Sequence, residues 1–598
     1  MRSSRWKACW RRQQEPLPVV AMPEIADFLF QITSLIRETA AQRLAEWGCG
    51  ELADGIELER PAISKHGDYS TNIALVAAGR AKRPPRELAS QLADDFSAAR
   101  TLQPLLSHTE IAGPGFINFF LRPAALAGAV QTGITLGARF GSSLPAAPEK
   151  ILLEFVSANP TGTLHVGHAR YAAYGDALRR ILEFAGHDVT SEFYINDYGT
   201  QMEIFGRTLA ARYAQELGLG GKIPDEGYQG EYPRHVAKLI AEEAGDRFAG
   251  EMTPEPTPAA LSFFRQRGCE LVLGEMRAEL ERFRVGFDSW FSESRLYSSG
   301  EAEAAIEELK RAGEAVEREG ALWLLTTRYG DDKDRVLIRG SGEPTYFASD
   351  IAYHRDKLER GYDRLINIWG ADHHGYVPRM KAAFEALAHD PERLEIIIGQ
   401  LVNLIQMGER RQMSKRAGTM VTLAELVDGI GVDAARFFLV DRSHDTTLDL
   451  DMEKAKLKSE ENPVYYVQYA HARICSILRK SETGGEAGVE TGGEEEPAGA
   501  TQTAAGGPFS LQPQERELIL KQADFPAVVR AAAITRSPQR LTTYARELAA
   551  VFHVFYHNCP VLRADPGTAA FRLDLCRLTR YVIARSLDLV GVAAPEKM

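Results

Sequence analysis

A unit of strand, loop, helix and strand near residue 150 constrains the fold of this chain more than any other feature. Residues 151–156 form a short apolar run, which N-P-T-G at 159–162 ends. Residues 169–185 then repeat alanine and leucine at helical spacing as far as Gly186, and a second apolar run comes at 189–195. Strand, helix and strand in this order predict a doubly wound parallel (Rossmann-like) α/β sheet.

The same alternation resumes later in the chain. Strands are expected at 365–369 and 394–401, on either side of a helix at 377–388. Between the two parts of the sheet, residues 205–335 are rich in helical patterns, and we interpret them as a helical insertion. The α/β domain as a whole is predicted to span residues 148–452.

Two further domains are expected beside the α/β domain. Residues 22–125 are predicted to form an N-terminal α+β domain, and residues 453–598 a C-terminal all-α helical bundle. Within that bundle, residues 481–508 contain Gly, Ala, Thr and Glu and almost no large apolar side chain. Such a segment cannot bury enough surface to offset its ordering entropy, so we predict a disordered acidic insert.

The first 21 residues differ in composition from the rest of the chain. Residues 1–21 carry five Lys and Arg residues and a single acid, Glu15. A transit peptide has this composition, but so does a translated stretch upstream of a start codon at Met22. The absence of a clear amphipathic period favours the second interpretation, a disordered extension.

Composition narrows the class of protein. Apolar residues make up 44% of the chain and charged residues 25%, and no apolar run is long enough to span a membrane. The six cysteines are scattered without a C-x-x-C pair, which argues against a structural zinc site and against disulfides and favours a cytoplasmic protein. The net charge of −12 neither predicts nor excludes RNA binding, because local patches attract nucleic acid.

The strongest chemical signal is S-A-N-P-T-G-T-L-H-V-G-H, residues 157–168, between the first strand and its helix. Doubly wound sheets bind ligands there, and Gly167 lets a phosphate approach the backbone at the start of the helix. His165 and His168 are candidate catalytic residues, since both can donate hydrogen bonds to charge that develops on a phosphate. The pair could instead be structural. The spacing also suits metal ligands, but no thiol or carboxylate at motif spacing accompanies it.

A second signal is Q-M-S-K-R-A-G-T, residues 412–419. Lys415 offers a mobile positive charge to a leaving pyrophosphate, which makes it a candidate catalytic residue. A lysine in a polar loop is by itself more often solvated surface. Its occurrence on the same α/β framework as H-V-G-H strengthens the functional interpretation.

H-V-G-H and M-S-K-R resemble the two signature motifs of the class I aminoacyl-tRNA synthetases. Longer segments resemble the arginyl-tRNA synthetases specifically, and the resemblance extends from about Pro23 to the C-terminus. These segments are E-F-V-S-A-N-P-T-G (154–162), Y-I-N-D-Y-G (194–199), P-T-Y-F-A-S-D-I-A-Y-H (344–354) and W-G-A-D-H-H-G-Y-V (369–377).

The resemblance implies a ligase that activates arginine with ATP. The products of this first step would be arginyl-adenylate and pyrophosphate, and the arginyl group would then pass to the 2′-hydroxyl of the terminal ribose of tRNA(Arg). L-Arginine, tRNA(Arg) and ATP are the implied partners, with Mg²⁺ accompanying ATP as part of the substrate and with no zinc. We expect a cytoplasmic monomer without membrane contact.

The resemblance also implies site residues. The ATP-binding candidates are Gly167, Gly370, Asp372, Met413 and Ser414, and the arginine-binding candidates are Glu154, Asn159, Tyr346 and Asp350. A guanidinium group needs planar acceptors in a fork-like arrangement, and Tyr346 and Asp350 are four residues apart, so a helix would place them on one face. The alternative for Asp350 is a local cap or ion pair.

The chain departs from the family pattern at Gln412, where the signature often begins with lysine. Some relatives that lack this lysine are thought to use another just before H-x-G-H, but here that segment is T-G-T-L. Lys415, with Arg416, would then have to stabilise the departing pyrophosphate. The usual two-lysine arrangement is therefore in doubt.

The flanking domains resemble the tRNA-contacting parts of the family, an added N-terminal domain and a C-terminal anticodon-binding domain. The tRNA-binding candidates are Phe116, Asn118, Tyr469, Arg473, Tyr556 and Met598. Exposed aromatic and basic side chains suit unstacked bases. Equally, the tyrosines could be core aromatics at helical spacing, and G-F-I-N-F around Phe116 could be a plain buried strand.

Two rival hypotheses remain. A small-molecule nucleotidyltransferase shares H-x-G-H and a lysine loop, but it needs neither flanking domain. An inactive paralogue that only binds RNA is the other rival, and intact His165, His168 and Lys415 argue against it.

Overall fold

A computed structural model describes residues 27–142, 147–252, 255–410, 420–483 and 510–598 of the 598-residue chain. The described residues divide into two compact units, one of residues 27–136 and one that begins at Gly137. Among these residues no helix is long and apolar enough to cross a membrane. The predicted extension, 1–21, and most of the predicted acidic insert, 481–508, lie outside the described residues.

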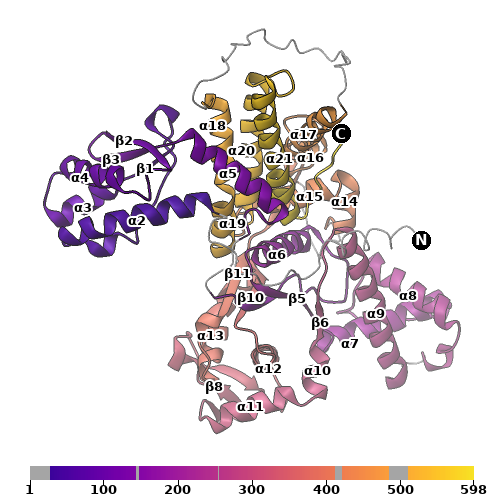
Figure 1. Cartoon of the computed structure of the whole chain (residues 1–598). Helices are drawn as coiled ribbons and strands as arrows, with labels where there is room; N and C mark the ends of the chain where they lie inside the picture. Colours follow the sequence, from indigo (N-terminus) through magenta and orange to yellow (C-terminus); the bar gives the residue numbers. More distant parts are fainter. Residues whose placement is uncertain (1–26, 143–146, 253–254, 411–419, 484–509) are drawn as a thin grey trace. The chain divides into compact units, whose positions relative to one another are not determined.

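The first unit is a three-stranded antiparallel sheet packed against helices (Figure 1, indigo). The strand order is β1-β3-β2, and Tyr69 of β1 lies opposite Phe119 of β3. Helix α4 buries Leu88, Leu92 and Phe96 at the four-residue spacing that gives an apolar stripe. The elements are α2 (Phe28–Glu46), β1 (Tyr69–Thr71), α3 (Ile73–Ala81), α4 (Pro85–Ala98), β2 (Leu106–Ala112), β3 (Phe116–Leu121) and α5 (Pro123–Leu136).

The second unit is built around a five-stranded parallel sheet of order β11-β10-β4-β5-β6. Its strands are β4 (Lys150–Glu154), β5 (Asp188–Ile195), β6 (Ser289–Ser292), β10 (Arg364–Gly370) and β11 (Leu394–Gly399). Leu152 of the central strand pairs with Thr190 on one side and Leu365 on the other. The chain extends the sheet from β4 through β5 to β6, then returns to add β10 and β11 on the opposite side. The predicted doubly wound parallel sheet is confirmed.

Helices cover both faces of this sheet (Figure 1). They are α6 (Val166–Phe184) on one face and α12 (Tyr346–Glu359) and α13 (Val377–Ala386) on the other. Leu152 and Leu365 pack with Ile351 and Phe384 in the core beneath α12 and α13. The H-V-G-H helix ends where predicted, before Gly186, whose φ of +98° is the left-handed conformation that stops helices.

Residues 205–335 are not a purely helical insertion. Three helices that pack on one another account for the first part: α7 (Thr200–Glu216), α8 (Glu231–Ala244) and α9 (Pro258–Arg282). The next segment contains β6, which belongs to the parallel sheet, and then α10 (Glu293–Ser298) and α11 (Glu301–Arg311). After these, β7 (Ala315–Arg318), β8 (Ala321–Leu324) and β9 (Arg335–Ile338) form an antiparallel sheet. The helical prediction is wrong for these strands, because a four-residue strand such as β6 buries only Phe291 fully and leaves no apolar run to detect.

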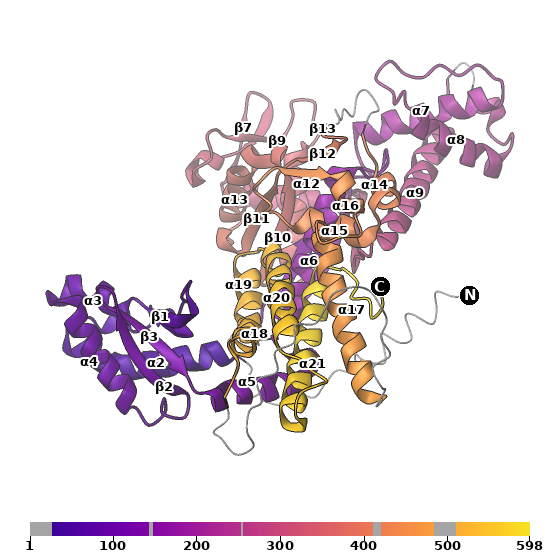
Figure 2. The ribbon, with the colours of Figure 1, turned by 90° about the horizontal axis from the view of Figure 1, so that it is seen from above.

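The C-terminal region is helical, as predicted. Its helices lie side by side in both views (Figures 1 and 2): α17 (Pro463–Glu482), α18 (Pro513–Ala523), α19 (Phe525–Ile534), α20 (Gln539–Asn558) and α21 (Pro566–Leu589). A small sheet of order β13-β12-β14 and three short helices precede them. These are β12 (Val402–Gln406), β13 (Glu409–Arg410), α14 (Leu423–Ile430), α15 (Val432–Val440), β14 (Leu448–Asp451) and α16 (Met452–Lys456).

A buried ion pair joins the H-V-G-H helix to the end of the chain. Arg436 of α15 and Asp176 of α6 are both 0% exposed, and Nη2 lies 2.6 Å from Oδ2. The guanidinium also donates to the carbonyl oxygens of Phe283 (3.0 Å) and Val590 (3.1 Å), and a Cβ at Gly591 would collide with it. Burial acts to raise the pKa of Asp176, but the neighbouring guanidinium groups, Arg436 first, outweigh it and lower the pKa to about 2.

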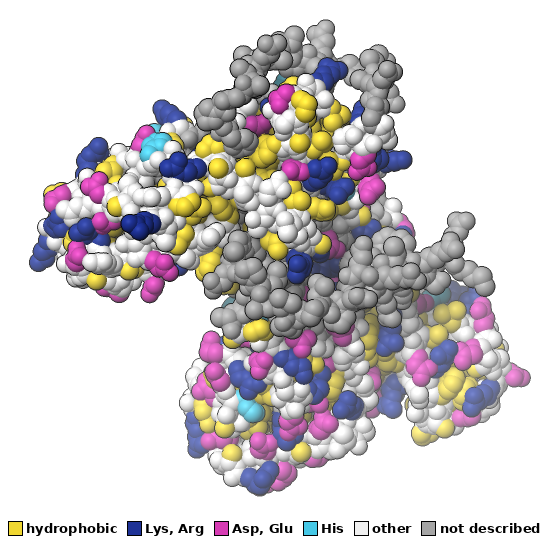
Figure 3. Space-filling view, viewed as in Figure 1, with side chains coloured by type: hydrophobic (Ala, Val, Ile, Leu, Met, Phe, Trp, Pro, Cys, Tyr) yellow, Lys and Arg dark blue, Asp and Glu magenta, His cyan; other side chains and the backbone are white. Residues whose placement is uncertain are grey.

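Charges of both signs are interspersed over the face that carries α11 and α13 (Figure 3). On α11, Lys310 pairs with Glu307, while Glu308 pairs with Arg355 of α12. Exposed pairs of this kind contribute little to stability. This face therefore offers no uniformly basic surface for nucleic acid.

Candidate active site

The carboxyl ends of β4 and β10 meet where the sheet reverses its direction of growth. β4 ends at Glu154 and leads towards α6, and β10 ends at Gly370 and leads into the short 3₁₀-helix η7 (Ala371–Tyr376). In doubly wound sheets, ligands bind in the crevice outside the strand ends at this point. The motif segments 154–168 and 369–377 both lie there.

The two histidines of H-V-G-H begin helix α6. The His165 side chain accepts the N–H of Gly167 at 3.1 Å, and His168 Nδ1 accepts the N–H of His165 at 3.3 Å, so the pair forms a capping box. Their rings stack, with centroids 3.7 Å apart. A Cβ at Gly167 would lie only 3.0 Å from the His165 ring. Both rings are thus held at the helix N-terminus, where N–H groups and the helix dipole favour an anion.

The lysine motif itself lies outside the described residues, because 411–419 includes Gln412, Met413, Ser414, Lys415 and Arg416. The segment directly after it is hydrogen-bonded to the H-V-G-H loop. Val166 N–H donates to the carbonyl of Val421 (3.0 Å), and Leu423 N–H donates to that of Leu164 (2.8 Å). The backbone therefore anchors the chain that leaves the lysine loop beside the two histidines.

Gly370 and Asp372 lie at the end of β10, as predicted. A Cβ at Gly370 would lie 2.6 Å from Asp372 Oδ1 and 3.4 Å from the hydroxyl of Tyr171. Tyr171 is on α6, and its hydroxyl donates to the carbonyl of Gly399 at the end of β11 (3.2 Å). The Asp372 carboxylate is exposed, with His373 Nε2 at 3.5 Å, and can accept hydrogen bonds from a ligand.

Tyr346 and Asp350 lie one turn apart on α12. Tyr346 is 52% exposed, and its hydroxyl lies 3.7 Å from the position of a Cβ on Gly199 in the Y-I-N-D-Y-G segment. The Asp350 carboxylate accepts a hydrogen bond from the hydroxyl of Tyr376. α12 thus carries a phenol and a carboxylate one turn apart, as the four-residue spacing predicts.

Glu154 ends strand β4, and Asn159 lies in the loop that follows it. Glu154 is 6% exposed; its Oε2 accepts from Lys357 Nζ at 2.6 Å and its Oε1 from Ser157 Oγ at 2.9 Å. The side-chain amide of Asn159 donates to Gln201 Oε1 at 2.8 Å. Each of these two predicted residues therefore already has a protein partner.

The chain between them is strained. Val156 has φ +71° and Ser157 has φ +42°, and a β-branched residue in the left-handed region is an outlier. The Ser157 hydroxyl holds this turn, since it donates to Glu154 and accepts the N–H of Tyr194 at 3.2 Å. Strain of this kind concentrates at functional sites.

The carboxyl groups of Glu154, Asp350 and Glu293 interact electrostatically, Glu154 with Asp350 and Asp350 with Glu293. Burial raises the pKa of Asp350 to about 7; the charge of Glu154 adds to this effect, while the hydrogen bond from Tyr376 opposes it. Burial and the charge of Asp350 raise the pKa of Glu293 to about 7. A cation placed among these three carboxyl groups would remove the cost of ionising them.

Sequence reasoning missed Glu293 and Lys357. Glu293 is 2% exposed on α10 and lies in S-E-S, a segment without any motif. Lys357 lies in R-D-K-L-E-R, which is typical of a solvated helix face, yet it is 0% exposed. The one available signal was the helical spacing from Tyr346 and Asp350 through His354 to Lys357.

The structure brings three of the predicted tRNA-binding residues together on the C-terminal helices. Arg473 donates to the Tyr469 hydroxyl at 2.7 Å, and its guanidinium lies 4.5 Å from the ring centroid of Tyr556. Met598 is 54% exposed. In the first unit, Phe116 is exposed, whereas Asn118 is buried and lies opposite Glu110 and Ser70 in the sheet. The side chain of Asn118 is therefore not accessible, because strand β3 is covered on that side.

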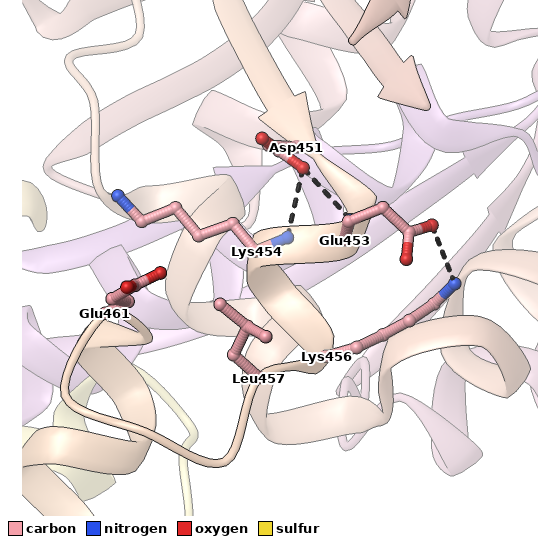
Figure 4. Close-up of a pocket in the computed structure, with 6 residues that line it drawn as sticks. All are labelled: Asp451, Glu453, Lys454, Lys456, Leu457 and Glu461. Carbon is pink, nitrogen blue, oxygen red and sulfur yellow. Dashed lines mark hydrogen bonds and ion pairs between the residues drawn. The ribbon is translucent and has the colours of Figure 1, made fainter. Parts of the chain in front are cut away.

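The described residues contain no group of three or more His, Cys, Asp or Glu side chains arranged to hold a metal. A cavity of about 550 Å³ beside α16 contains none of the predicted site residues (Figure 4). Asp451 there accepts the N–H groups of Glu453 and Lys454 at 3.0 Å, and Lys456 pairs with Glu453 at 3.2 Å. The lining thus contains one ion pair, the capping carboxylate of Asp451 and two further charged side chains, Lys454 and Glu461.

Comparison with known proteins agrees with this geometry. The family model described as tRNA synthetases class I (R), catalytic domain, matches residues 138–474. The model of the arginyl tRNA synthetase N terminal domain matches residues 31–121, and that of the DALR anticodon binding domain matches residues 467–598. The fold and the site therefore define a class I aminoacyl-tRNA synthetase.

Individual relatives give the specific family. The chain is 47% identical to an arginine–tRNA ligase of Bacillus cereus over 575 residues, which are 95% of this chain and all of the relative. It is also 47% identical to that of Geobacillus kaustophilus over 94% of this chain and 97% of the relative. The arginyl-tRNA synthetase of Thermus thermophilus has the same fold, with a TM-score of 0.71 at 24% identity over 95% of this chain and all of the other.

The chain belongs to the arginyl-tRNA synthetase family, and its activity is that of an arginine–tRNA ligase, which uses ATP to charge tRNA(Arg). The predicted family and activity are confirmed. Because matched domains lie on both sides of the catalytic domain, the chain is not a small-molecule nucleotidyltransferase.

Proposed function

We propose that the recess lined by Glu154, Glu293 and Asp350 binds the cationic groups of arginine. The observation that carries this proposal is that the pKa values of Asp350 and Glu293 are both raised to about 7, by burial first and then by a neighbouring carboxylate, Glu154 for Asp350 and Asp350 for Glu293. Carboxyl groups arranged in this way stabilise a buried cation, because the cation removes both the repulsion between them and part of the cost of burial. Tyr346 and Asn159 supply neutral hydrogen-bonding groups at the rim.

ATP binds, in this proposal, across the carboxyl ends of β4 and β10. Gly167 and the first N–H groups of α6 face the phosphates, while Gly370 and Asp372 face the ribose. Met413 and Ser414 contact the nucleotide from the lysine loop. Mg²⁺ arrives with ATP as part of the substrate, and no zinc takes part.

Catalysis then consists of positioning and charge stabilisation. The carboxylate of arginine attacks the α-phosphate, the bond from that phosphate to the bridging oxygen breaks, and pyrophosphate leaves. His165 and His168 donate hydrogen bonds to the charge that develops on the phosphates, and Lys415 stabilises the departing pyrophosphate. The 2′-hydroxyl of the terminal ribose next attacks the arginyl carbonyl, and AMP leaves. With Gln412 at the first signature position, we assign the lysine's role to Lys415, assisted by Arg416.

The flanking regions bind tRNA(Arg). Residues 453–598 take the anticodon, with Tyr469, Arg473 and Tyr556 as a surface on which bases stack, and with Met598 beside them. Residues 22–125 contact the body of the tRNA through the exposed ring of Phe116. The α/β domain of residues 148–452 performs the chemistry, and the enzyme acts as a cytoplasmic monomer.

The test is arginine-dependent ATP–pyrophosphate exchange, measured with and without total tRNA. We expect exchange with arginine that depends on tRNA, because the family typically requires tRNA before it activates arginine. Exchange with a different amino acid would contradict the assignment of the recess. Absence of exchange under both conditions would support an inactive protein that only binds RNA.

A further inference from the structure

Lys357 is a fully buried lysine behind the arginine recess. It lies on α12, about two turns beyond Asp350, and is 0% exposed. A buried ammonium is costly unless it is paired and hydrogen-bonded. Here it contacts Glu154 Oε2 at 2.6 Å, Asn367 Oδ1 at 3.0 Å and the ring of Tyr353 at 4.1 Å from the centroid. Two of its N–H bonds therefore have oxygen acceptors, and the aromatic ring borders the ammonium as a cation–π partner.

The hydrogen bonds continue from Lys357 back to Asp350. An ammonium can only donate, so the Asn367 oxygen must face Lys357 and its amide N–H₂ must donate to His354 Nε2, at 2.7 Å. His354 Nδ1 in turn donates to the carbonyl of Asp350 at 2.7 Å. Burial, together with the charge of Lys357, holds the pKa of His354 well below its ordinary value, which keeps this ring neutral. The chain of contacts links the carboxylate of Glu154 to the helical turn that carries Asp350.

The other charges nearby are already paired. Glu192 on β5 accepts two hydrogen bonds from Arg360, at 2.7 and 2.9 Å, and one from the hydroxyl of Tyr353 at 2.7 Å. The charge of Lys357 also helps to lower the pKa of Glu192, but the carboxylate that the ammonium contacts directly is that of Glu154.

We propose that Lys357 is a positioning residue of the arginine pocket, which holds the Glu154 carboxylate in place so that Glu154 and Asp350 act together on the substrate cation. The proposal rests on the role of Glu154 stated above and deepens it. Without the ammonium, the Glu154 carboxylate would lose its hydrogen bond of 2.6 Å and the positive charge that faces it. The carboxylate would then be free to leave this position, and the substrate cation would lose one of its acceptors.

The test is Lys357→Met, which keeps the length of the side chain and removes its charge. We expect the KM for arginine in the exchange reaction to rise by roughly 30-fold, the scale for removing one partner of a buried charge pair. The KM for ATP should change by less than about twofold, because Lys357 contacts Glu154, Asn367 and Tyr353 and none of these is assigned to ATP. Lys381→Met is the matched control: Lys381 pairs with Glu392 at 3.0 Å on the surface, and its loss should leave both KM values unchanged.

A second pair of variants separates this proposal from the role of Glu154. If Lys357 acts through Glu154, adding Lys357→Met to Glu154→Gln should raise the KM for arginine by less than about twofold over Glu154→Gln alone. The double variant removes both members of the Glu154–Lys357 ion pair, so neither charge is left buried without its partner. The comparison can therefore be made even if Lys357→Met alone does not fold. An equal rise in both backgrounds, or equal rises for arginine and ATP, would overturn the proposal for Lys357. An unchanged KM in Glu154→Gln would instead refute the role of Glu154 itself.

Discussion

The elevated pKa of Asp350 predicts how arginine binding depends on pH. The carboxyl has a pKa of about 7 in the free enzyme, whereas its ordinary value is 3.8. A guanidinium is bound by the ionised form, so arginine must displace the proton wherever the group is protonated. Affinity for arginine should therefore fall as the pH is lowered through about 7.

The titration of Asp350 alone gives a minimum magnitude, because the pKa of Glu293 is also about 7. With a pKa of about 7, roughly 90% of the enzyme has ionised Asp350 at about pH 8 and roughly 10% at about pH 6. The Kd for arginine should rise by about tenfold over this interval. Stability of the free enzyme should change in the opposite sense: between about pH 4 and pH 7 the folded state binds more protons than the unfolded state, so the free energy of unfolding falls as the pH rises.

Equilibrium dialysis with radiolabelled arginine measures this Kd directly. Asp350→Asn should bind arginine more weakly and lose the part of the pH dependence that Asp350 contributes, while Glu293, whose pKa is also about 7, retains the rest. Glu154→Gln should shift the midpoint for Asp350 to lower pH, because it removes the charge of Glu154 that opposes ionisation of Asp350. A wild-type Kd that is constant from about pH 6 to about pH 8 would refute the reasoning from buried, mutually repelling carboxyl groups.

Three other predictions concern different parts of the chain. His168→Ala should slow adenylate formation by roughly 100-fold or more while tRNA binding in a filter assay stays within about twofold of wild type; equal exchange rates would contradict the catalytic role. Arg436→Met should lower the free energy of unfolding by about 3–5 kcal/mol in urea titrations, because it leaves buried Asp176 without its ion-pair partner. Adding Asp176→Asn should recover part of this loss, because it removes the unpaired charge. Arg473→Ala should raise the KM for tRNA by roughly tenfold and leave the KM for ATP unchanged, and equal effects on both would argue against a base-stacking surface with Tyr556.

The sequence predicts those parts of the fold whose signals are local. The H-V-G-H helix is a clear case: an apolar strand, a break at N-P-T-G and a stop at Gly186 are all readable within forty residues or so. The face shared by Tyr346 and Asp350 is equally local. β6 is different, since four residues with Phe291 as the one fully buried side chain carry no period, and parallel pairing with β5 specifies the strand.

Contacts between distant segments explain why Lys357 and Glu293 escape prediction. Glu154 and Lys357 are 203 residues apart in the chain, so the pair becomes visible only when β4 and α12 are packed together. A lysine among charged neighbours has the same local appearance whether it is solvated or buried. Glu293 similarly acquires its significance from Asp350 on another helix.

The strand order of the parallel sheet has a consequence for synthesis of the chain. β4 is the central strand, yet it is the first of the five to be synthesised. β5 follows soon after and can pair with β4 early. The other neighbour, β10, comes much later: Asp363, which accepts a hydrogen bond from Lys150 at the start of this pairing, lies 213 positions after Lys150. Until those residues leave the ribosome, the second edge of β4, with apolar Ile151, Leu152 and Leu153, has no neighbour. An unpaired apolar strand edge is prone to aggregation, so nascent chains that end before β10 should depend on chaperones far more than complete ones.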